Sequence, residues 1–133
     1  MKTTAIISWI LRIIAAGILF QTLYFKFTAH PESVALFTKL GVEPWGRIAT
    51  GVLELITGIL LLLPSTTFLG GFLAMGLMLG AIASHLLVIG IESQGDGGQL
   101  FILAVVVLKL SIIIQVLHRK QAQQFIHTYF PAN

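Results

Sequence analysis

The sequence predicts an all-α fold: a polytopic transmembrane four-helix bundle with a short interfacial helix between helices 1 and 2. Hydrophobic residues make up 56% of the 133 residues and charged residues only 10%, whereas soluble domains carry about 25% charged residues. Four apolar stretches of the chain are long enough to cross a hydrocarbon core of about 30 Å as helices. Open strands would leave backbone groups unpaired in lipid, so helix is the expected form of each stretch.

The predicted spans cover residues 4–27, 45–63, 67–89 and 100–117 of one domain, residues 1–133. The first span follows Met1-Lys2, as the apolar part of a signal peptide would. It continues past Phe20 without a small-residue cleavage site, so we expect a helix that is not cleaved.

A short helix is predicted between the first two spans. Pro31 ends the helix before it, and Gly41 ends the short helix itself. Its apolar face, which includes Phe37, predicts an interfacial or re-entrant helix that lies over the bundle. Pro44 then opens the second span in its first turn, with Trp45 at the lipid boundary.

The second and third spans are joined by the minimal turn Pro64-Ser65-Thr66, which predicts that they are antiparallel neighbours. The third span carries small residues at four-residue spacing, a pattern that lets another helix approach closely. Two interpretations stay open, namely packing inside the bundle and the seam of a homo-oligomer. These small residues, called the small-residue ridge below, are Gly76, Gly80 and Ser84.

The fourth span follows a polar, acidic loop at residues 92–99. After this span, the tail carries apolar residues at helical spacing, which predicts a short amphipathic helix along the membrane surface. These residues are Phe125, Ile126, Tyr129 and Phe130.

An even number of spans places both termini on one side of the membrane. Lys2, Arg119 and Lys120 lie on that side. The opposite side carries as many basic residues but also most of the acidic ones, so we expect the termini to be cytoplasmic. The opposite set is Lys26, Lys39 and Arg47, accompanied by Glu32, Glu43, Glu92 and Asp96.

Composition excludes several classes of chemistry. The chain has no cysteine, which removes disulfides, thiolate metal ligands, thiol redox catalysis and covalent haem. Its four histidines lack metal-ligand spacing, so neither a metal centre nor a bis-histidine haem is indicated. No flavin or phosphate-binding motif is present. The eight Lys and Arg residues are scattered along the chain with no basic stripe and no interleaved aromatic residues, which argues against nucleic-acid binding.

Glu54 lies in the middle of the apolar second span, where an acid costs about 2.5–3.5 kcal/mol to insert even on the mildest scale. Counted from the terminal side, Arg12 and Lys109 reach a similar depth of roughly 12–15 Å in their own spans. These three residues form a first candidate ligand-binding layer near the midplane. They are either a structural ion network that fixes helix register, or a site for a polar headgroup such as a quinone, or a proton relay.

A second candidate layer lies near the opposite interface. His85 is expected there at about the level of Gln21, a little below Lys26, and Gln99 precedes the fourth span on the same side. A single interfacial histidine is either a hydrogen-bonded packing residue or a ligand. We expect Glu54 and His85 to belong to different layers.

Several segments carry a family resemblance: Arg12, Phe20 and Lys26, residues 41–44 (Gly-Val-Glu-Pro), residues 51–62 (the run around Glu54), His85, and residues 97–99 (Gly-Gly-Gln). Together they resemble the DoxX family of small bacterial membrane proteins, over residues 8–117. The resemblance implies a multi-pass four-helix protein of the bacterial inner (plasma) membrane. Some relatives are linked to quinone-coupled oxidation of sulfur compounds or to redox-stress complexes.

From the polar layers and the resemblance we expect an accessory or quinone-interacting subunit of a redox-associated membrane system, with a membrane or soluble redox partner. In this interpretation the ligand lies beside Glu54, and Arg12 and Lys109 polarise its head. The alternative is a non-enzymatic membrane scaffold or partner-binding subunit whose buried charges are structural. The sequence leaves open whether the protein is an enzyme.

Overall fold

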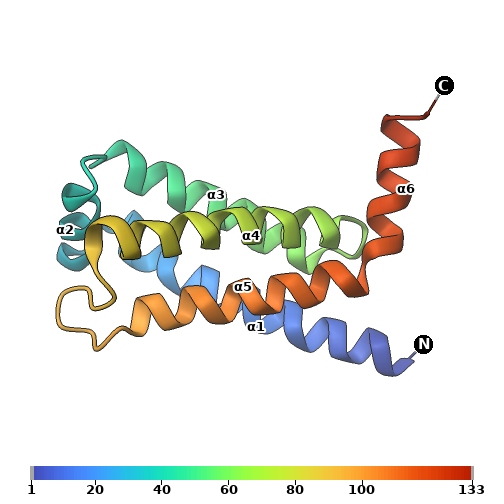
Figure 1. Ribbon diagram of the computed structural model, residues 1–133, viewed down its shortest axis with the longest axis horizontal. Helices are drawn as coiled ribbons and strands as arrows, with labels where there is room; N and C mark the ends of the chain where they lie inside the picture. Colours follow the sequence, from blue (N-terminus) through green and yellow to red (C-terminus); the bar gives the residue numbers. More distant parts are fainter. Residues whose placement is uncertain (1, 133) are drawn as a thin grey trace.

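The computed structural model describes residues 2–132, and every regular element among them is helical (Figure 1). The predicted all-α fold is therefore confirmed. The elements are α1 (Lys2–Phe27), α2 (Pro31–Lys39), α3 (Trp45–Leu62), the 3-10 turn η1 (Pro64–Thr66), α4 (Thr67–Ser84), the π-helical turn η2 (His85–Ile89), α5 (Gln99–Leu117) and α6 (Arg119–Tyr129).

Four helical segments are long and apolar enough to cross a membrane: α1, α3, the run from η1 through η2, and α5. They match the predicted spans to within a few residues, as expected for a multi-pass membrane protein. Helix α1 packs against α3 and α5, and α4 packs against the same two helices. The four helices therefore form a bundle with α1 and α4 on opposite corners, and α2 covers one end of it (Figure 1).

Helix α2 begins and ends close to where the sequence predicts. Pro31 occupies its first turn, and the ring Nδ1 of His30 accepts a hydrogen bond of 3.3 Å from the backbone nitrogen of Glu32. Gly41, with a φ of +78°, supplies the left-handed residue that follows the helix. The short helix between the first two spans is thus confirmed.

Helix α5 begins at a turn that Asp96 holds in place. Its carboxylate accepts backbone hydrogen bonds from Ser93 (3.0 Å), Gly98 (2.8 Å) and Leu100 (3.1 Å). Burial raises the pKa of Asp96, but the three backbone hydrogen bonds lower it, and the net pKa lies below its ordinary value. An ionised carboxylate therefore fixes the loop at this end of the bundle.

Helices α1 and α3 pack closely through two glycines of α3. A Cβ atom added at Gly51 would lie 2.8 Å from the ring of Phe27, and one added at Gly58 would overlap the ring of Phe20. These contacts define an antiparallel register. Glu54 lies between the two glycines and is therefore level with the last two turns of α1.

Helices α3 and α4 approach most closely beside the η1 turn. A Cβ atom at Gly70 would lie 2.6 Å from the backbone nitrogen of Leu61, so this approach requires glycine. Further along α4, a Cβ atom at Gly76 or Gly80 would meet nothing within 4 Å. The two helices separate toward α2, as Figure 1 shows.

This geometry corrects the packing interpretation of the small-residue ridge on α4. Gly76, Gly80 and Ser84 do not seat another helix of this chain but border a cavity. Their spacing is visible in the sequence, whereas the face of α4 that points at α3 is not. Gly70 makes the close contact instead. A homo-oligomer seam along the ridge stays a prediction.

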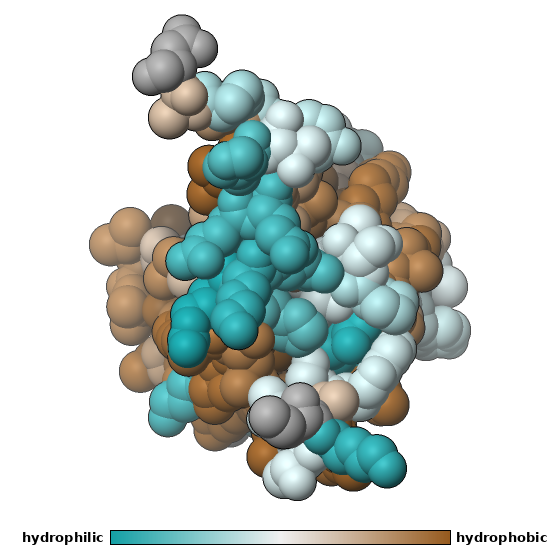
Figure 2. Space-filling view, turned by 90° about the vertical axis from the view of Figure 1, so that its right-hand side faces the viewer, coloured by the Kyte–Doolittle hydropathy of each residue, from teal (hydrophilic) through white to brown (hydrophobic). Residues whose placement is uncertain are grey.

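Helix α6 turns away from the bundle at the end where both termini lie (Figure 1). Gln121 ties it to the start of α4: its side-chain oxygen accepts a hydrogen bond from the backbone nitrogen of Phe68 (2.9 Å), and its nitrogen donates to the carbonyl of Pro64 (2.6 Å). The rings of Phe125 and Phe68 lie 5.1 Å apart. Figure 2 shows the hydrophilic side chains gathered over this end.

Gly70→Ala is expected to destabilise the fold by about 1–3 kcal/mol, the usual cost of overpacking. The added methyl group would push α4 off the backbone of α3. Gly76→Ala is the matched control, because its methyl group enters open space and alanine favours the helix. Thermal unfolding of the purified protein in detergent measures both changes. Equal melting temperatures for the two variants would contradict the close contact at Gly70.

Candidate functional site

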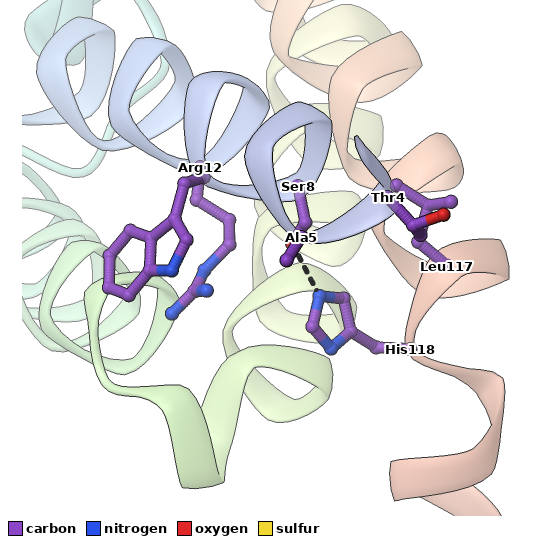
Figure 3. Close-up of a pocket in the computed structure, with 7 residues that line it drawn as sticks. Thr4, Ala5, Ser8, Arg12, Leu117 and His118 are labelled. Atoms are coloured by element: carbon purple, nitrogen blue, oxygen red, sulfur yellow. Dashed lines mark hydrogen bonds between the residues drawn. The ribbon is translucent and has the colours of Figure 1, made fainter. Parts of the chain in front are cut away.

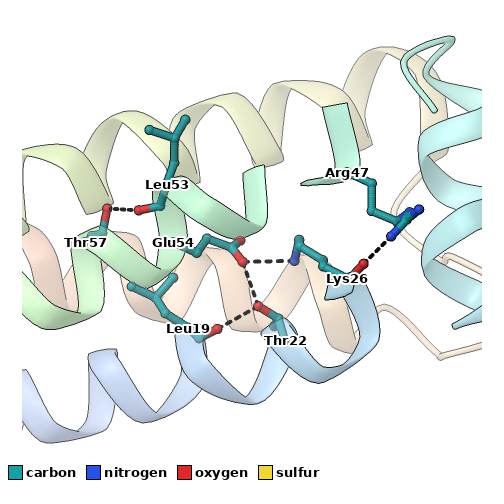
Figure 4. Close-up of polar contacts among 7 residues, drawn as sticks. All are labelled: Leu19, Thr22, Lys26, Arg47, Leu53, Glu54 and Thr57. Atoms are coloured by element: carbon teal, nitrogen blue, oxygen red, sulfur yellow. Dashed lines mark hydrogen bonds and ion pairs between the residues drawn. The ribbon is translucent and has the colours of Figure 1, made fainter. Parts of the chain in front are cut away.

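Glu54 is buried inside the bundle, and its partner is Lys26 near the end of α1 (Figure 4). The Nζ atom of Lys26 lies 3.1 Å from Oε2 of Glu54, with the two side chains 13% and 7% exposed. The hydroxyl of Thr22 donates to the same oxygen at 2.9 Å. Among membrane-spanning helices, each buried charge persists because the other compensates it.

The Lys26–Glu54 pair has hydrogen-bonding atoms that no other described residue uses. Both contacts to Glu54 use Oε2, and Oε1 has no hydrogen-bond partner among residues 2–132. The ammonium group of Lys26 has donors beyond the one that faces Glu54. The hydroxyl of Thr22 has one proton and two acceptors within reach, Oε2 of Glu54 and the carbonyl oxygen of Leu19, which lies 2.8 Å away. The pair can therefore both donate to and accept from a third polar group.

Arg47 fixes the position of Lys26. Its Nη1 atom donates to the backbone oxygen of Lys26, and its Nε atom donates to Oε1 of Glu43 at 2.8 Å. Since Arg47 is buried in the first turn of α3, it clamps the end of α1 to the start of α3. From the sequence, Arg47 is expected only as a basic residue that flanks a span. The signal for the clamp is its four-residue spacing from Glu43.

A cavity of about 540 Å³ lies beside the Lys26–Glu54 pair and extends to the α2 end of the bundle. Helix α2 covers it with Leu36 and Phe37, and α4 borders it with Gly76 and Gly80. Its ionisable and amide lining groups include Gln21, Lys26, Glu54, His85, Asp96 and Gln99. Polar groups from every span thus converge on one space.

His85 lies at the start of the π-helical turn and is 4% exposed. Its Nδ1 atom lies 2.9 Å from the carbonyl oxygen of Gly90. Because a carbonyl only accepts, we assign the ring proton to Nδ1. The ring of Phe101 packs against the His85 ring at a centroid distance of 5.8 Å. The Nε2 atom has no hydrogen-bond partner among residues 2–132 and is free to meet a molecule in the cavity.

The members of the predicted second layer, Gln21, Lys26, His85 and Gln99, all line this cavity. Glu54 lines it too, which corrects the expectation that Glu54 and His85 belong to different layers. Within the described part of the chain, no group of His, Asp or Glu residues is arranged to hold a metal ion. Ligand binding in the cavity stays a prediction.

Arg12 lies apart from this cavity, toward the terminal end of the bundle. Its Nε atom donates to the carbonyl of Leu61 at 2.6 Å, and its Cζ atom lies 3.8 Å from the centroid of the Trp9 ring. Within residues 2–132, the ion pair of Glu54 is the one with Lys26 and none joins it to Arg12. Lys26 is therefore the partner of Glu54, in place of the predicted Arg12.

Lys109 faces outward from the bundle. It lies near the middle of α5 with an exposed side chain, close to the exposed Ile112 and Ile113. The predicted midplane layer of Arg12, Glu54 and Lys109 therefore does not assemble within one chain.

The depth estimate was wrong because the spans do not begin at one level. Helix α1 has 26 residues and α3 has 18, so counting from the end of each span places Arg12 too close to Glu54. The position of Lys109 could not be predicted for a different reason, namely that the inward-facing side of α5 is not evident. Helix α5 is apolar nearly all round, so its sequence does not indicate which side points inward.

Replacing one member of the Lys26–Glu54 pair is expected to destabilise the protein more than replacing both. Glu54→Gln or Lys26→Met alone leaves an uncompensated buried charge, which costs about 3–5 kcal/mol. The double variant removes both charges and is expected to recover much of that loss. Thermal unfolding of the four proteins in detergent gives the coupling energy.

The control cycle combines Glu54→Gln with Lys109→Met. Because Lys109 faces outward, these two effects are expected to add without coupling. A larger coupling of Glu54 to Lys109 than to Lys26 would overturn the described pairing.

Comparison with known proteins gives one match. The model of the DoxX-like family matches residues 10–114, which is well over half of the chain. The curated proteins and the solved structures gave no match. All residues that line the cavity, among them Lys26, Glu54, His85 and Gln99, lie within the matched segment. On this evidence the chain belongs to the DoxX-like family.

Proposed function

We propose that the protein binds the polar head of an amphiphile, such as a quinone, in the cavity beside Glu54, as an accessory subunit of a redox-associated membrane system. The observation that carries this proposal is the Lys26–Glu54 pair on the cavity wall. An acid and a base with unused hydrogen-bonding atoms face a space enclosed by membrane-spanning helices.

The chemistry of the lining suits both oxidation states of a quinone. The carbonyl oxygens of the oxidised head accept hydrogen bonds, which Lys26 and the amide of Gln21 or Gln99 can donate. The hydroxyl groups of the reduced head donate, and Oε1 of Glu54 and Nε2 of His85 can accept. The same groups can exchange the protons that accompany quinone reduction, with a membrane or soluble redox partner handling the electrons.

The size and the border of the cavity support the same proposal. Pockets for small molecules occupy about 300–1,000 Å³, and this cavity has about 540 Å³. Gly76 and Gly80 border it and are exposed. The gap that they leave between α3 and α4 gives an apolar tail a route to the lipid.

The proposal includes a location in the bacterial inner membrane with cytoplasmic termini. No Asp or Glu occurs before Glu32 or after Asp96, whereas Lys2, Arg119 and Lys120 lie at the terminal end. An excess of basic residues is typical of the cytoplasmic side. A single cysteine introduced into α6 of this cysteine-free chain should react only with reagent on the cytoplasmic side. Labelling of intact cells from outside would contradict this orientation.

Gly80→Leu is expected to reduce bound quinone about tenfold or more, since leucine takes cavity space that the ligand would occupy. Gly17→Leu is the matched control: its Cβ atom also meets nothing within 4 Å, but Gly17 does not line the cavity. The measurement is quinone extracted from protein purified in mild detergent, or bound from an added short-chain quinone. Absence of quinone from the wild type, or equal content in both variants, would refute the proposal.

Lys109 favours a second candidate function, that of a partner-binding subunit. Its exposed side chain lies ten residues after Gln99 and eight before Leu117, too deep for its chain to reach water at either end easily. The acid inside the bundle, Glu54, is already paired with Lys26. A membrane helix of a partner protein that carries an acid at mid-depth would compensate Lys109.

Lys109→Leu is expected to release such a partner while leaving the fold intact, because leucine suits a lipid-facing position. Blue native electrophoresis of gently solubilised membranes would show a smaller complex than wild type. Lys109→Arg is expected to keep the complex, since it keeps the charge. An unchanged complex size in Lys109→Leu would count against a partner at this position.

A further inference from the structure

A second cavity, of about 250 Å³, lies at the opposite end of the bundle, between the start of α1 and the junction of α5 with α6 (Figure 3). Its polar lining consists of Thr4, Ser8, Arg12 and His118. It shares no lining residue with the cavity beside Glu54 and takes no part in the proposed function.

Arg12 brings an incompletely satisfied charge to this pocket. The residue is only 3% exposed. Its Nε atom donates to Leu61 and its guanidinium stacks on Trp9, but the buried Nη2 atom has no hydrogen-bond partner among residues 2–132. A buried guanidinium nitrogen without an acceptor is costly, so an acceptor brought by a ligand would be stabilising.

Ser8 and His118 add two more polar groups beside Arg12. The hydroxyl of Ser8 lies 2.6 Å from Nε2 of His118, and Figure 3 shows Arg12 and His118 on the same side of α1. Burial lowers the pKa of His118, and the positive charge of Arg12 lowers it further. Arg12, Ser8 and His118 thus place a positive charge beside two hydrogen-bonding groups.

The surroundings of the pocket carry positive charge and no compensating acid. Lys2, Arg119 and Lys120 lie at this end, and no Asp or Glu occurs in residues 2–31 or 97–132. The hydrophilic surface in Figure 2 covers the same end. An anion approaching this face therefore meets attraction only.

The pocket lies at the level where hydrocarbon gives way to headgroups. His118 directly follows the last residue of α5, so its contact with Ser8 places that residue of α1 at the end of a span. Arg12 is one turn further along α1, about 6 Å deeper. Trp9, beside Arg12, is a residue type enriched at this boundary.

We propose that this pocket binds a phosphate group, carried by a lipid headgroup or free as inorganic phosphate. The phosphate oxygens accept hydrogen bonds from the guanidinium of Arg12, whose planar N–H groups suit the geometry of phosphate. If Nε2 of His118 donates its proton to the oxygen of Ser8, the hydroxyl of Ser8 can donate its own proton to another phosphate oxygen. The volume of about 250 Å³ accommodates a phosphate with its first attached atoms.

The test uses the Trp45→Phe protein in a maltoside detergent, because Trp9 is then the one tryptophan left of two. Phosphatidic acid, the matching diacylglycerol and inorganic phosphate are titrated while Trp9 fluorescence is recorded. The expected result is a saturable change with a phosphate compound and none with diacylglycerol. Saturation by phosphatidic acid alone supports a lipid phosphate, and saturation by inorganic phosphate supports the free ion. No saturable change with either compound would overturn the proposal.

Arg12→Gln is expected to weaken this binding about tenfold or more. Arg119→Gln is the matched control, because it removes the same charge from the same end at an exposed residue outside the pocket. Equal weakening in the two variants would overturn the site in favour of a general surface charge effect.

Arg12 also bonds to Leu61, so Arg12→Gln can unfold the protein. Ala5→Leu covers that case, because Ala5 lines the pocket, is exposed, and has no side-chain hydrogen bond to lose. The expected outcome is an unchanged melting temperature with phosphate binding lost. Wild-type affinity in a folded Ala5→Leu protein would show that the pocket is not the site.

Discussion

The ion pair between Lys26 and Glu54 is the constraint on which the rest of the bundle depends. A carboxylate among membrane-spanning helices needs a compensating charge, and Lys26 supplies it from the last turns of α1. The contact requires α1 and α3 to lie close, which Gly51 and Gly58 allow by accepting aromatic rings of α1 against their backbone. Arg47 then locks the end of α1 in place. The same register leaves one face of the pair open to the cavity.

The fold could be predicted from the sequence because four long apolar runs leave few alternatives in lipid, and because Pro31, Gly41 and the short turn at residues 64–66 mark where helices stop. The partner of Glu54 could not. Depth along a span is readable from residue counts only if all spans start at one level, and α1 starts further out than the others. Which face points inward is also hidden wherever a helix is apolar all round, as α5 is around Lys109. The sequence places Lys26 at the α2 end of the bundle, but its contact with Glu54 depends on the α1–α3 register.

The two ends of the bundle differ in charge: one carries paired acids and bases, and the other carries bases alone. At the α2 end, basic residues meet acids: Lys26 with Glu54, and Arg47 with Glu43. At the terminal end the charges of Lys2, Arg12, Arg119 and Lys120 have no acid in the neighbouring sequence. One end is thus suited to exchange protons and hydrogen bonds within the chain, and the other to receive negative charge from outside it.

The hydrogen bonds of Gln121 carry a mechanical consequence. This side chain joins α6 to the backbone at the start of α4, and Phe125 adds an aromatic contact with Phe68. The far half of α4 forms the glycine border of the large cavity. Because a helix is stiff along its axis, a displacement of α6 would be transmitted through Pro64 and Phe68 to α4, and so to the glycine border of the cavity.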